Sequence, residues 1–167
     1  MCTLSTLVIV CDSADVPPET SDIVIASPKA RFGLPEPQVG VYAYGGGLPR
    51  LVKTVGMQAA CDIALAGKQL SAEEALSLRL VQGISKTPES VLEETLAKAQ
   101  QIASISPDGI IVTRAALREA WETASVERAF QISHDTFFEK LMKSENSAEG
   151  LAAFREKRKP NWRRAKL

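Results

Sequence analysis

The feature that most constrains the fold of this chain is a succession of helical segments that begins near Gly45 and continues almost to the last residue. Glycines separate the first segments, and Ser71-Ala-Glu-Glu74 has the spacing of a capping box, in which a hydroxyl and a carboxylate satisfy free backbone N–H groups reciprocally. Apolar residues then recur at helical spacing, and Thr87-Pro88 is a typical helix start. We expect helices that start at 71 and 88, and others at 48–55, 57–66, 108–123, 126–142 and 151–154.

Strand-like segments are few and short. Apolar and β-branched residues predict strands at 7–10, 22–26 and 79–84, and a short extended piece at 30–33. So few strands do not make a stable sheet without further partners. The pattern therefore indicates an α/β chain. Either its N-terminal strands pack onto the helices, or further strands of the sheet are missing from this sequence.

The composition is that of an ordinary soluble globular domain, with 45% hydrophobic and 24% charged residues in a chain of 167. Lys+Arg and Asp+Glu are both 20, so no overall field favours nucleic acid or an anionic membrane. The apolar stretch 4–10 is too short to span a bilayer and lacks the flanks of a secretory signal. Three scattered cysteines and one histidine predict free thiols in a reducing compartment and no metal site.

The strongest candidate for chemistry is Glu36, which lies in the rigid loop Phe32-Gly-Leu-Pro-Glu-Pro37. A carboxyl group held among Phe, Leu and Pro loses hydration, which suits it to proton transfer near neutral pH. The alternative is an exposed glutamate in a turn, which is common beside proline. The local pattern alone favours this alternative.

Two other features have mainly structural interpretations. Gly45-Gly-Gly47 precedes a helix and could let backbone N–H groups approach an anion, but it lacks the spacing of a nucleotide-binding loop, so a tight loop is favoured. His134 lies beside Asp135 within a predicted helix. Neighbouring side chains diverge on a helix, so we expect a structural or surface histidine rather than a catalytic pair.

The chain ends in a basic tail, in which lysines and arginines outnumber the single acid Glu156. A solvated end is the default interpretation, and binding to ligand phosphates or to nucleic acid is the alternative, although only Trp162 offers a surface for base stacking. Ala165-Lys166-Leu167 resembles the Ser-Lys-Leu peroxisomal address, which an import receptor reads at the extreme C-terminus. Pro160 and the adjacent arginines predict an unfolded, solvated presentation of this tag.

Several motifs occur together, in order, from about residue 21 to the end, and they resemble the enoyl-CoA hydratase/isomerase (crotonase) family. The residues that carry this resemblance are Ser21-Asp-Ile-Val-Ile-Ala-Ser27, Phe32-Gly-Leu-Pro-Glu36, Gly40, Gly45-Gly-Gly-Leu-Pro-Arg-Leu51, Val55-Gly56, Leu65-Ala-Gly67, Ser71-Ala-Glu-Glu-Ala75, Leu80-Val81 and Glu149-Gly-Leu-Ala-Ala-Phe-Arg-Glu-Lys-Arg-Lys-Pro160.

The resemblance implies the C-terminal part of a crotonase-like (ClpP/crotonase) α/β fold, with few short strands followed by a mostly helical region. It divides the chain into a poorly matching segment 1–21, a partial crotonase-like domain 22–160 and an exposed tail 161–167 with the peroxisomal signal. The helices of this family pack on a trimer neighbour, so homo- or hetero-oligomers are implied.

The resemblance also implies acyl-CoA thioester substrates, with coenzyme A as part of the substrate and no separate cofactor. Glu36 falls where the family places an acid/base glutamate. In hydratases this residue exchanges a proton at the α-carbon, and in isomerases it moves a proton between carbons. Lys157, Arg158 and Lys159 are candidates to meet the phosphates of coenzyme A.

Segment 11–21 departs from the family, whose corresponding stretch supplies an oxyanion-hole N–H and, in hydratases, a second glutamate. No Gly-Gly-Gly occurs there, and Glu19 in its Pro17-Pro18 setting does not have the required spacing. N–H donors stabilise the enolate that forms beside a thioester. Glu36 alone therefore fits isomerisation better than hydration.

Three interpretations remain open. The chain is an enoyl-CoA isomerase or hydratase (a lyase) of peroxisomal fatty-acid β-oxidation-like metabolism, or of secondary-metabolite (toxin) acyl metabolism. Alternatively, it is a catalytically dead, shortened paralogue that acts only as an oligomerisation partner, or residues 1–20 come from a wrong start or an unspliced segment. A nucleic-acid-binding module rests only on the basic tail and is disfavoured.

Overall fold

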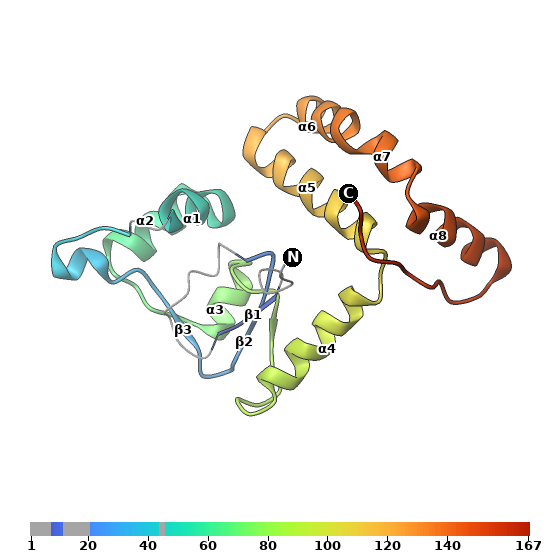
Figure 1. Cartoon of the computed structure of the whole chain (residues 1–167). Helices are drawn as coiled ribbons and strands as arrows, with labels where there is room; N and C mark the ends of the chain where they lie inside the picture. The colour runs from blue at the N-terminus through green and yellow to red at the C-terminus, as the bar shows by residue number, and fades with distance from the viewer. Residues whose placement is uncertain (1–7, 12–20, 44–45) are drawn as a thin grey trace. The chain divides into compact units, whose positions relative to one another are not determined.

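The structure is a computed structural model that describes residues 8–11, 21–43 and 46–167. The chain divides into two compact units, Met1–Ala99 and Gln100–Leu167. Figure 1 shows the short strands and small helices of the first unit and the helices of the second. Each unit is described by itself.

The first unit contains a parallel sheet with strand order β1-β2-β5. Its strands are β1 (Val8–Cys11), β2 (Ile23–Ala26) and β5 (Gly83–Ile84). Val8 lies opposite Ile23, and Ile25 lies opposite Gly83. The side chain of Gln82 extends this ladder, because its Oε1 accepts the backbone N–H of Val24 at 2.8 Å.

The predicted strand at 79–84 is correct in place but too long. Only Gly83 and Ile84 pair with β2, and Arg79 has a φ of 62°, which ends any extended conformation there. The predictions at 22–26 and 30–33 are confirmed, the second as β3 (Arg31–Phe32), which pairs antiparallel with β4 (Leu70–Ser71).

Helices of the first unit follow the predicted order. They are the 3-10 helix η3 (Glu36–Val39), α1 (Gly47–Val55), α2 (Met57–Leu65) and α3 (Ala72–Ser77). The predicted capping box is present at α3. Ser71 Oγ accepts the Glu74 N–H at 3.2 Å, and Glu74 Oε2 accepts the Ser71 N–H at 2.8 Å.

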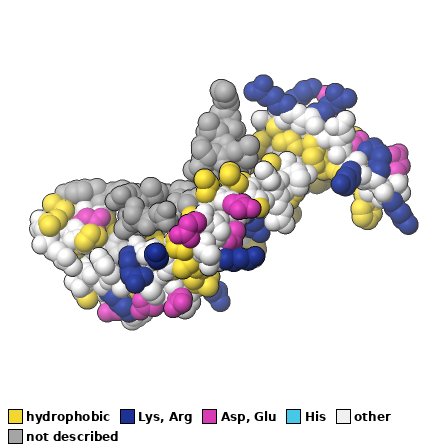
Figure 2. Space-filling model, turned by 90° about the horizontal axis from the view of Figure 1, so that it is seen from below, with side chains coloured by type: hydrophobic (Ala, Val, Ile, Leu, Met, Phe, Trp, Pro, Cys, Tyr) yellow, Lys and Arg dark blue, Asp and Glu magenta, His cyan; other side chains and the backbone are white. Residues whose placement is uncertain are grey.

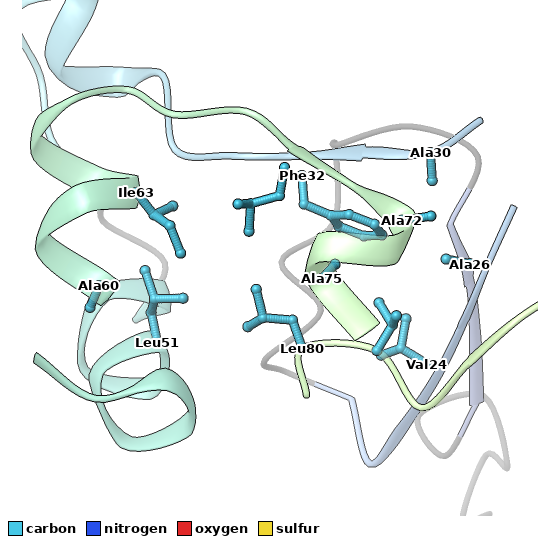
Figure 3. Packing of buried hydrophobic residues seen from close by; sticks show 12 residues of the cluster. Val24, Ala26, Ala30, Phe32, Leu51, Ala60, Ile63, Ala72, Ala75 and Leu80 are labelled. Atoms are coloured by element: carbon cyan, nitrogen blue, oxygen red, sulfur yellow. The ribbon is translucent and has the colours of Figure 1, made fainter. Parts of the chain in front are cut away.

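A single apolar cluster holds these elements together (Figure 3). Leu51 of α1 and Ile63 of α2 face Phe32 and Leu80, and alanines of α3 fill the space between the helix and β2. The alanines matter because a small side chain lets helix and strand backbones approach closely. This core fixes the position of the loop that carries Glu36.

The second unit is helical. Helix α4 (Val91–Ala103) crosses from one unit to the other, and it is followed by α5 (Pro107–Thr123), α6 (Val126–Ser133), the π-helix η4 (His134–Phe138), α7 (Glu139–Met142) and α8 (Glu145–Glu156). Serines 106, 125 and 144 cap α5, α6 and α8 with their hydroxyl groups. The helix predicted at 126–142 is present, with a π turn in its middle. No helix in the described part of the chain has the length and apolar character that a membrane crossing requires.

Candidate functional site

Glu36 opens the 3-10 helix η3, between Pro35 and Pro37. Both prolines restrict φ, so they favour a tight turn over an α-helix. The turn closes at Gly40, which has a φ of 81° and donates its N–H to the carbonyl oxygens of Glu36 and Pro37. Val41 N–H also bonds to Glu36 O at 3.1 Å. The backbone that carries the carboxyl group is therefore well defined.

The Glu36 side chain is partly buried, and its Oε2 atom is closed off from solvent without a hydrogen-bond partner in the described part of the chain. A buried carboxylate oxygen without a donor is costly, and such atoms are found where a ligand or a reaction needs them. The local pattern alone favoured an exposed turn glutamate. The burial of Oε2 favours the other interpretation, a carboxyl group removed from water.

Glycines seat η3 against the connection between α2 and β4. A Cβ atom at Gly67 would lie 2.3 Å from Nε2 of Gln38, so the side chain of Gln38 occupies that place. A Cβ atom at Gly33 would lie 3.0 Å from the carbonyl oxygen of Lys68. These close approaches fix the loop on both sides of Glu36.

The glycine run behaves as the tight loop that the sequence favoured. Gly46 has a left-handed conformation with a φ of 80° and precedes the first residue of α1. Arg50 donates to Gly46 O at 3.0 Å, which satisfies one carbonyl of this loop. Gly45 lies outside the described residues.

The three basic candidates lie at the end of α8, and they differ in what they contact. Lys157 ends the helix in a left-handed conformation with a φ of 54°. Arg158 binds the carboxylate of Glu149 with two hydrogen bonds of 2.6 and 2.9 Å, and it also binds Glu156. Arg158 is therefore committed to its own helix, whereas Lys157 and Lys159 are exposed and form no ion pair within the described residues.

The tail 158–167 differs from its prediction. Most of its residues are exposed, as expected, but it is not unfolded, because it runs back along its own unit. Trp162 Nε1 donates to Ser104 O at 2.8 Å, and the indole ring packs on Gly150. Lys166, within the predicted peroxisomal tag 165–167, donates its backbone N–H to Asp108 at 3.2 Å. Figure 2 shows dark-blue basic side chains among magenta acidic ones at the right-hand end of the molecule.

Local spacing did not find the residues that hold this tail. Asp108 and Asn146 are each 2% exposed, and Asn146 Nδ2 donates to Asp108 Oδ2 at 2.8 Å. Asn146 also binds the backbone of Arg163, donating to its carbonyl at 3.0 Å and accepting its N–H at 2.8 Å. In the sequence, Asp108 and Asn146 are only two polar residues near helix starts, and a role in helix capping would explain such residues equally well.

His134 is a surface residue, as predicted, but its contact with Asp135 was not predicted. Its ring stacks on Phe138 at 4.8 Å between centroids and lies 5.8 Å from Phe130. The π turn brings His134 Nδ1 within 3.3 Å of Asp135 Oδ1, although side chains of neighbouring helical residues were expected to diverge. Hydrogen bonds from Gln131 and then from His134 lower the pKa of Asp135.

No cluster of metal-binding side chains occurs among the residues that the structure describes. Cys61 is exposed, Cys2 lies outside the described residues, and only the backbone of Cys11 is described.

Known proteins are similar to this chain in sequence, and solved structures are similar to it in fold. A protein-family model described as enoyl-CoA hydratase/isomerase matches residues 19–165. The chain is 45% identical over 146 residues to mevalonyl-coenzyme A hydratase sidH of Aspergillus fumigatus. The matched residues make up 87% of this chain and 54% of the relative. It is 33% identical over 142 residues to 2,3-dehydroadipyl-CoA hydratase of Escherichia coli, covering 85% and 54%.

A solved structure leads to the same conclusion. An enoyl-CoA hydratase/isomerase from Mycobacterium paratuberculosis superposes with a TM-score of 0.82 at 31% identity, over 92% of this chain and 60% of that one. The chain spans about half the length of the curated relatives it matches. The crotonase-like fold expected from the sequence is thereby confirmed, and the chain belongs to the enoyl-CoA hydratase/isomerase family.

Proposed function

We propose that this chain acts on acyl-CoA thioesters by proton transfer at Glu36, as part of an enoyl-CoA hydratase or isomerase. The observation that carries the proposal is the partly buried Glu36 carboxyl group, whose Oε2 has neither water contact nor a donor within the described residues. This oxygen is available to exchange a proton with a carbon acid, because no hydrogen bond from the described residues occupies it.

The reaction at Glu36 is a proton exchange at the carbon beside the thioester. In isomerisation, the carboxylate removes a proton, the C–H electron pair enters the enolate, and the same proton returns to another carbon. In hydration, the water oxygen bonds to the β-carbon and the C=C electron pair moves into the enolate. The carboxylic acid of Glu36 then delivers its proton to the α-carbon, and the carboxylate that this leaves takes up the proton released by the water. Either route needs N–H donors near the thioester oxygen. In the family one of these donors comes from the stretch that corresponds to segment 11–21, where this chain has no Gly-Gly-Gly motif.

The substrate proposal starts from the named relatives. Proteins that are 45% and 41% identical to this chain, from Aspergillus fumigatus and Beauveria bassiana, are mevalonyl-coenzyme A hydratases. Mevalonyl-CoA is therefore the first thioester to test. It already carries a hydroxyl group on its β-carbon, so the reaction to expect is loss of water, the reverse of hydration, rather than the isomerisation that Glu36 alone suggested. This substrate is compatible with a role in secondary-metabolite acyl metabolism, and a role in fatty-acid degradation is equally compatible with it.

Lys157 and Lys159 are the proposed contacts for the phosphates of coenzyme A. Both are exposed cations at a fixed turn, and phosphates bind ammonium groups as compact charges. Arg158 is removed from the sequence-based set for direct contact, because two glutamates already bind it. Coenzyme A arrives as part of the substrate, and the proposal includes no separate cofactor.

The test compares Glu36→Gln with the wild type on mevalonyl-CoA, 2-enoyl-CoA and 3-enoyl-CoA, and measures deuterium exchange at the α-carbon. Glutamine keeps the shape but cannot take a proton, so we expect a loss of ~100-fold or more in turnover. Glu93→Gln is the control, because Glu93 is an exposed residue of α4. Equal rates for the wild type and Glu36→Gln would disprove the proposed chemistry.

A second function, a non-catalytic oligomerisation partner, is favoured by apolar side chains that the second unit leaves exposed. Phe154 is 85% exposed, Val126 78% and Phe130 68%, values far above those of core residues. Hydrophobic exposure of this kind marks interaction surfaces. Sedimentation of the chain alone and with a full-length relative tests it: association without turnover supports this function, and a monomer in both cases excludes it.

The location of the protein is a separate proposal. We expect Ala165-Lys166-Leu167 to act as a peroxisomal address when it stands at the C-terminus, with the import receptor as partner. The receptor must displace the contacts of Lys166 with Asp108 and Glu145. Fluorescence microscopy of the chain fused behind a fluorescent protein, with and without Leu167, tests this address, and an unchanged distribution would argue against it.

A further inference from the structure

The end of α8 contains a left-handed turn at a residue that is not glycine. Lys157 has φ 54° and ψ 37°, its N–H bonds to Phe154 O at 3.3 Å, and Arg158 N–H bonds to Ala153 O at 3.1 Å. Glycine is the usual residue at such a helix end, because a side chain is strained in this conformation. Lys157 keeps this strained backbone while its side chain is exposed to solvent.

The turn is clamped by one carboxylate. Glu149 binds the guanidinium of Arg158 through both oxygens and also accepts the backbone N–H of Asn161 at 2.7 Å. The clamp thus joins the helix to the chain on the far side of the turn. Trp162 on Gly150 and the bonds of Asn146 to Arg163 hold the next residues in place.

The charges at the turn are unequal. Arg158 is neutralised by Glu149 and Glu156, whereas the ammonium groups of Lys157 and Lys159 on either side of it have no ion-pair partner in the described part of the chain. Two exposed cations therefore flank a neutralised one on a turn that cannot move freely.

We propose that Glu149 is a positioning residue: by clamping Arg158, it holds the left-handed turn that presents Lys157 to a phosphate of the coenzyme A thioester. This inference rests on the proposed function. It gives Glu149 a part in binding the 3′-phosphate end of the substrate, in addition to the stabilising contacts that it makes within its own unit.

The first experiment separates binding from stability. Lys157→Gly relieves the strained backbone and removes the ammonium group, so we expect the thermal midpoint to rise by ~2 °C and the affinity for coenzyme A to fall by about tenfold. Ala124→Gly is the matched control, because Ala124 ends α5 with the same φ of 54°. It should raise the midpoint equally and leave affinity unchanged.

The second experiment uses the sign of a charge change. Glu149→Gln removes a negative charge, so electrostatics alone would strengthen phosphate binding. If Glu149 positions Lys157, the affinity for coenzyme A falls instead, and it does not fall further when Glu149→Gln is added to Lys157→Gly. Glu127→Gln on α6 removes an equal exposed charge of the same unit and should not weaken binding.

The probes are coenzyme A and 3′-dephospho-coenzyme A, with binding measured by calorimetry on the full chain. The inference is supported if Lys157→Gly and Glu149→Gln both bind coenzyme A more weakly than the wild type does. Lys157→Gly should also bind coenzyme A and 3′-dephospho-coenzyme A with equal affinity. Unchanged or tighter binding by Glu149→Gln overturns it while leaving the proposed function intact. A wild-type chain that binds neither probe overturns the inference and the coenzyme A part of the proposed function together.

Discussion

At the residue scale, the carboxylate of Glu149 accepts hydrogen bonds from a guanidinium and from the backbone. Hydrogen bonds from Arg158, and then from the backbone N–H of Asn161, lower its pKa to about 2. The same contacts with Glu149 and Glu156 raise the pKa of Arg158 above its already high value. Both groups of this pair are therefore ionised at neutral pH.

The pH dependence of this clamp has a definite sign. A carboxyl group with a pKa lowered by folding stabilises the folded state above its ordinary value of 4.5, and this stabilisation disappears as the pH falls towards about 2. We therefore expect the difference in thermal midpoint between the wild type and Glu149→Gln to be constant above pH ~5 and to shrink below it. A difference that is the same at pH 3 and pH 7 would contradict the clamp.

Asn146 carries a second prediction at this scale. Asn146→Ala removes one buried bond to Asp108 and two to the backbone of Arg163, so we expect a loss of ~2–4 kcal/mol in the free energy of unfolding. Urea denaturation measures it. Asn161→Ala is the control, because Asn161 is exposed and bonds to Glu149 only through its backbone N–H. Equal losses in both variants would contradict this role.

At the element scale, a capping motif predicts the start of α3, whereas the helix expected at 151–154 begins earlier, at Glu145, and the helix expected from 88 begins at Val91. We expect Ser71→Ala to cost about 1 kcal/mol of stability, because it removes the hydroxyl that caps α3. Chemical denaturation followed by circular dichroism measures the loss. Gln58→Ala in the exposed face of α2 should change stability by less than half as much, and a larger effect there would mean that capping is not the cause.

The elements also show why prediction from sequence had limits. Caps, glycine ends and apolar spacing act within a few residues, so the positions of α1, α2, α3 and the 126–142 helix could be predicted. The length of β5 and the path of the tail depend on Gln82 bonding Val24 and on Asn146 bonding Arg163, partners far apart in the sequence. Glu36 could be identified from the sequence because two prolines and a family motif surround it. The burial of its Oε2 atom could be seen only in the folded chain.

At the scale of the whole molecule, the division into two units predicts how the chain unfolds. Both tryptophans, Trp121 and Trp162, belong to the second unit, so their fluorescence reports on that unit alone. Far-ultraviolet circular dichroism reports on helices in both. Because each unit has its own internal contacts, we expect the two denaturation midpoints to differ, and coincident curves would indicate a single cooperative unit.

The contact between Asn146 and residue 163 also determines which substitutions related chains can tolerate. Both hydrogen bonds reach the backbone of Arg163, so any residue that keeps its N–H can replace that arginine, and proline alone is forbidden. Position 146 has no such freedom. The amide of Asn146 donates to Asp108 and to the carbonyl of Arg163 and also accepts the N–H of Arg163, whereas a hydroxyl group has a single donor. An aspartate would place two carboxylates face to face. The contact thus tolerates many substitutions at position 163 but few at position 146.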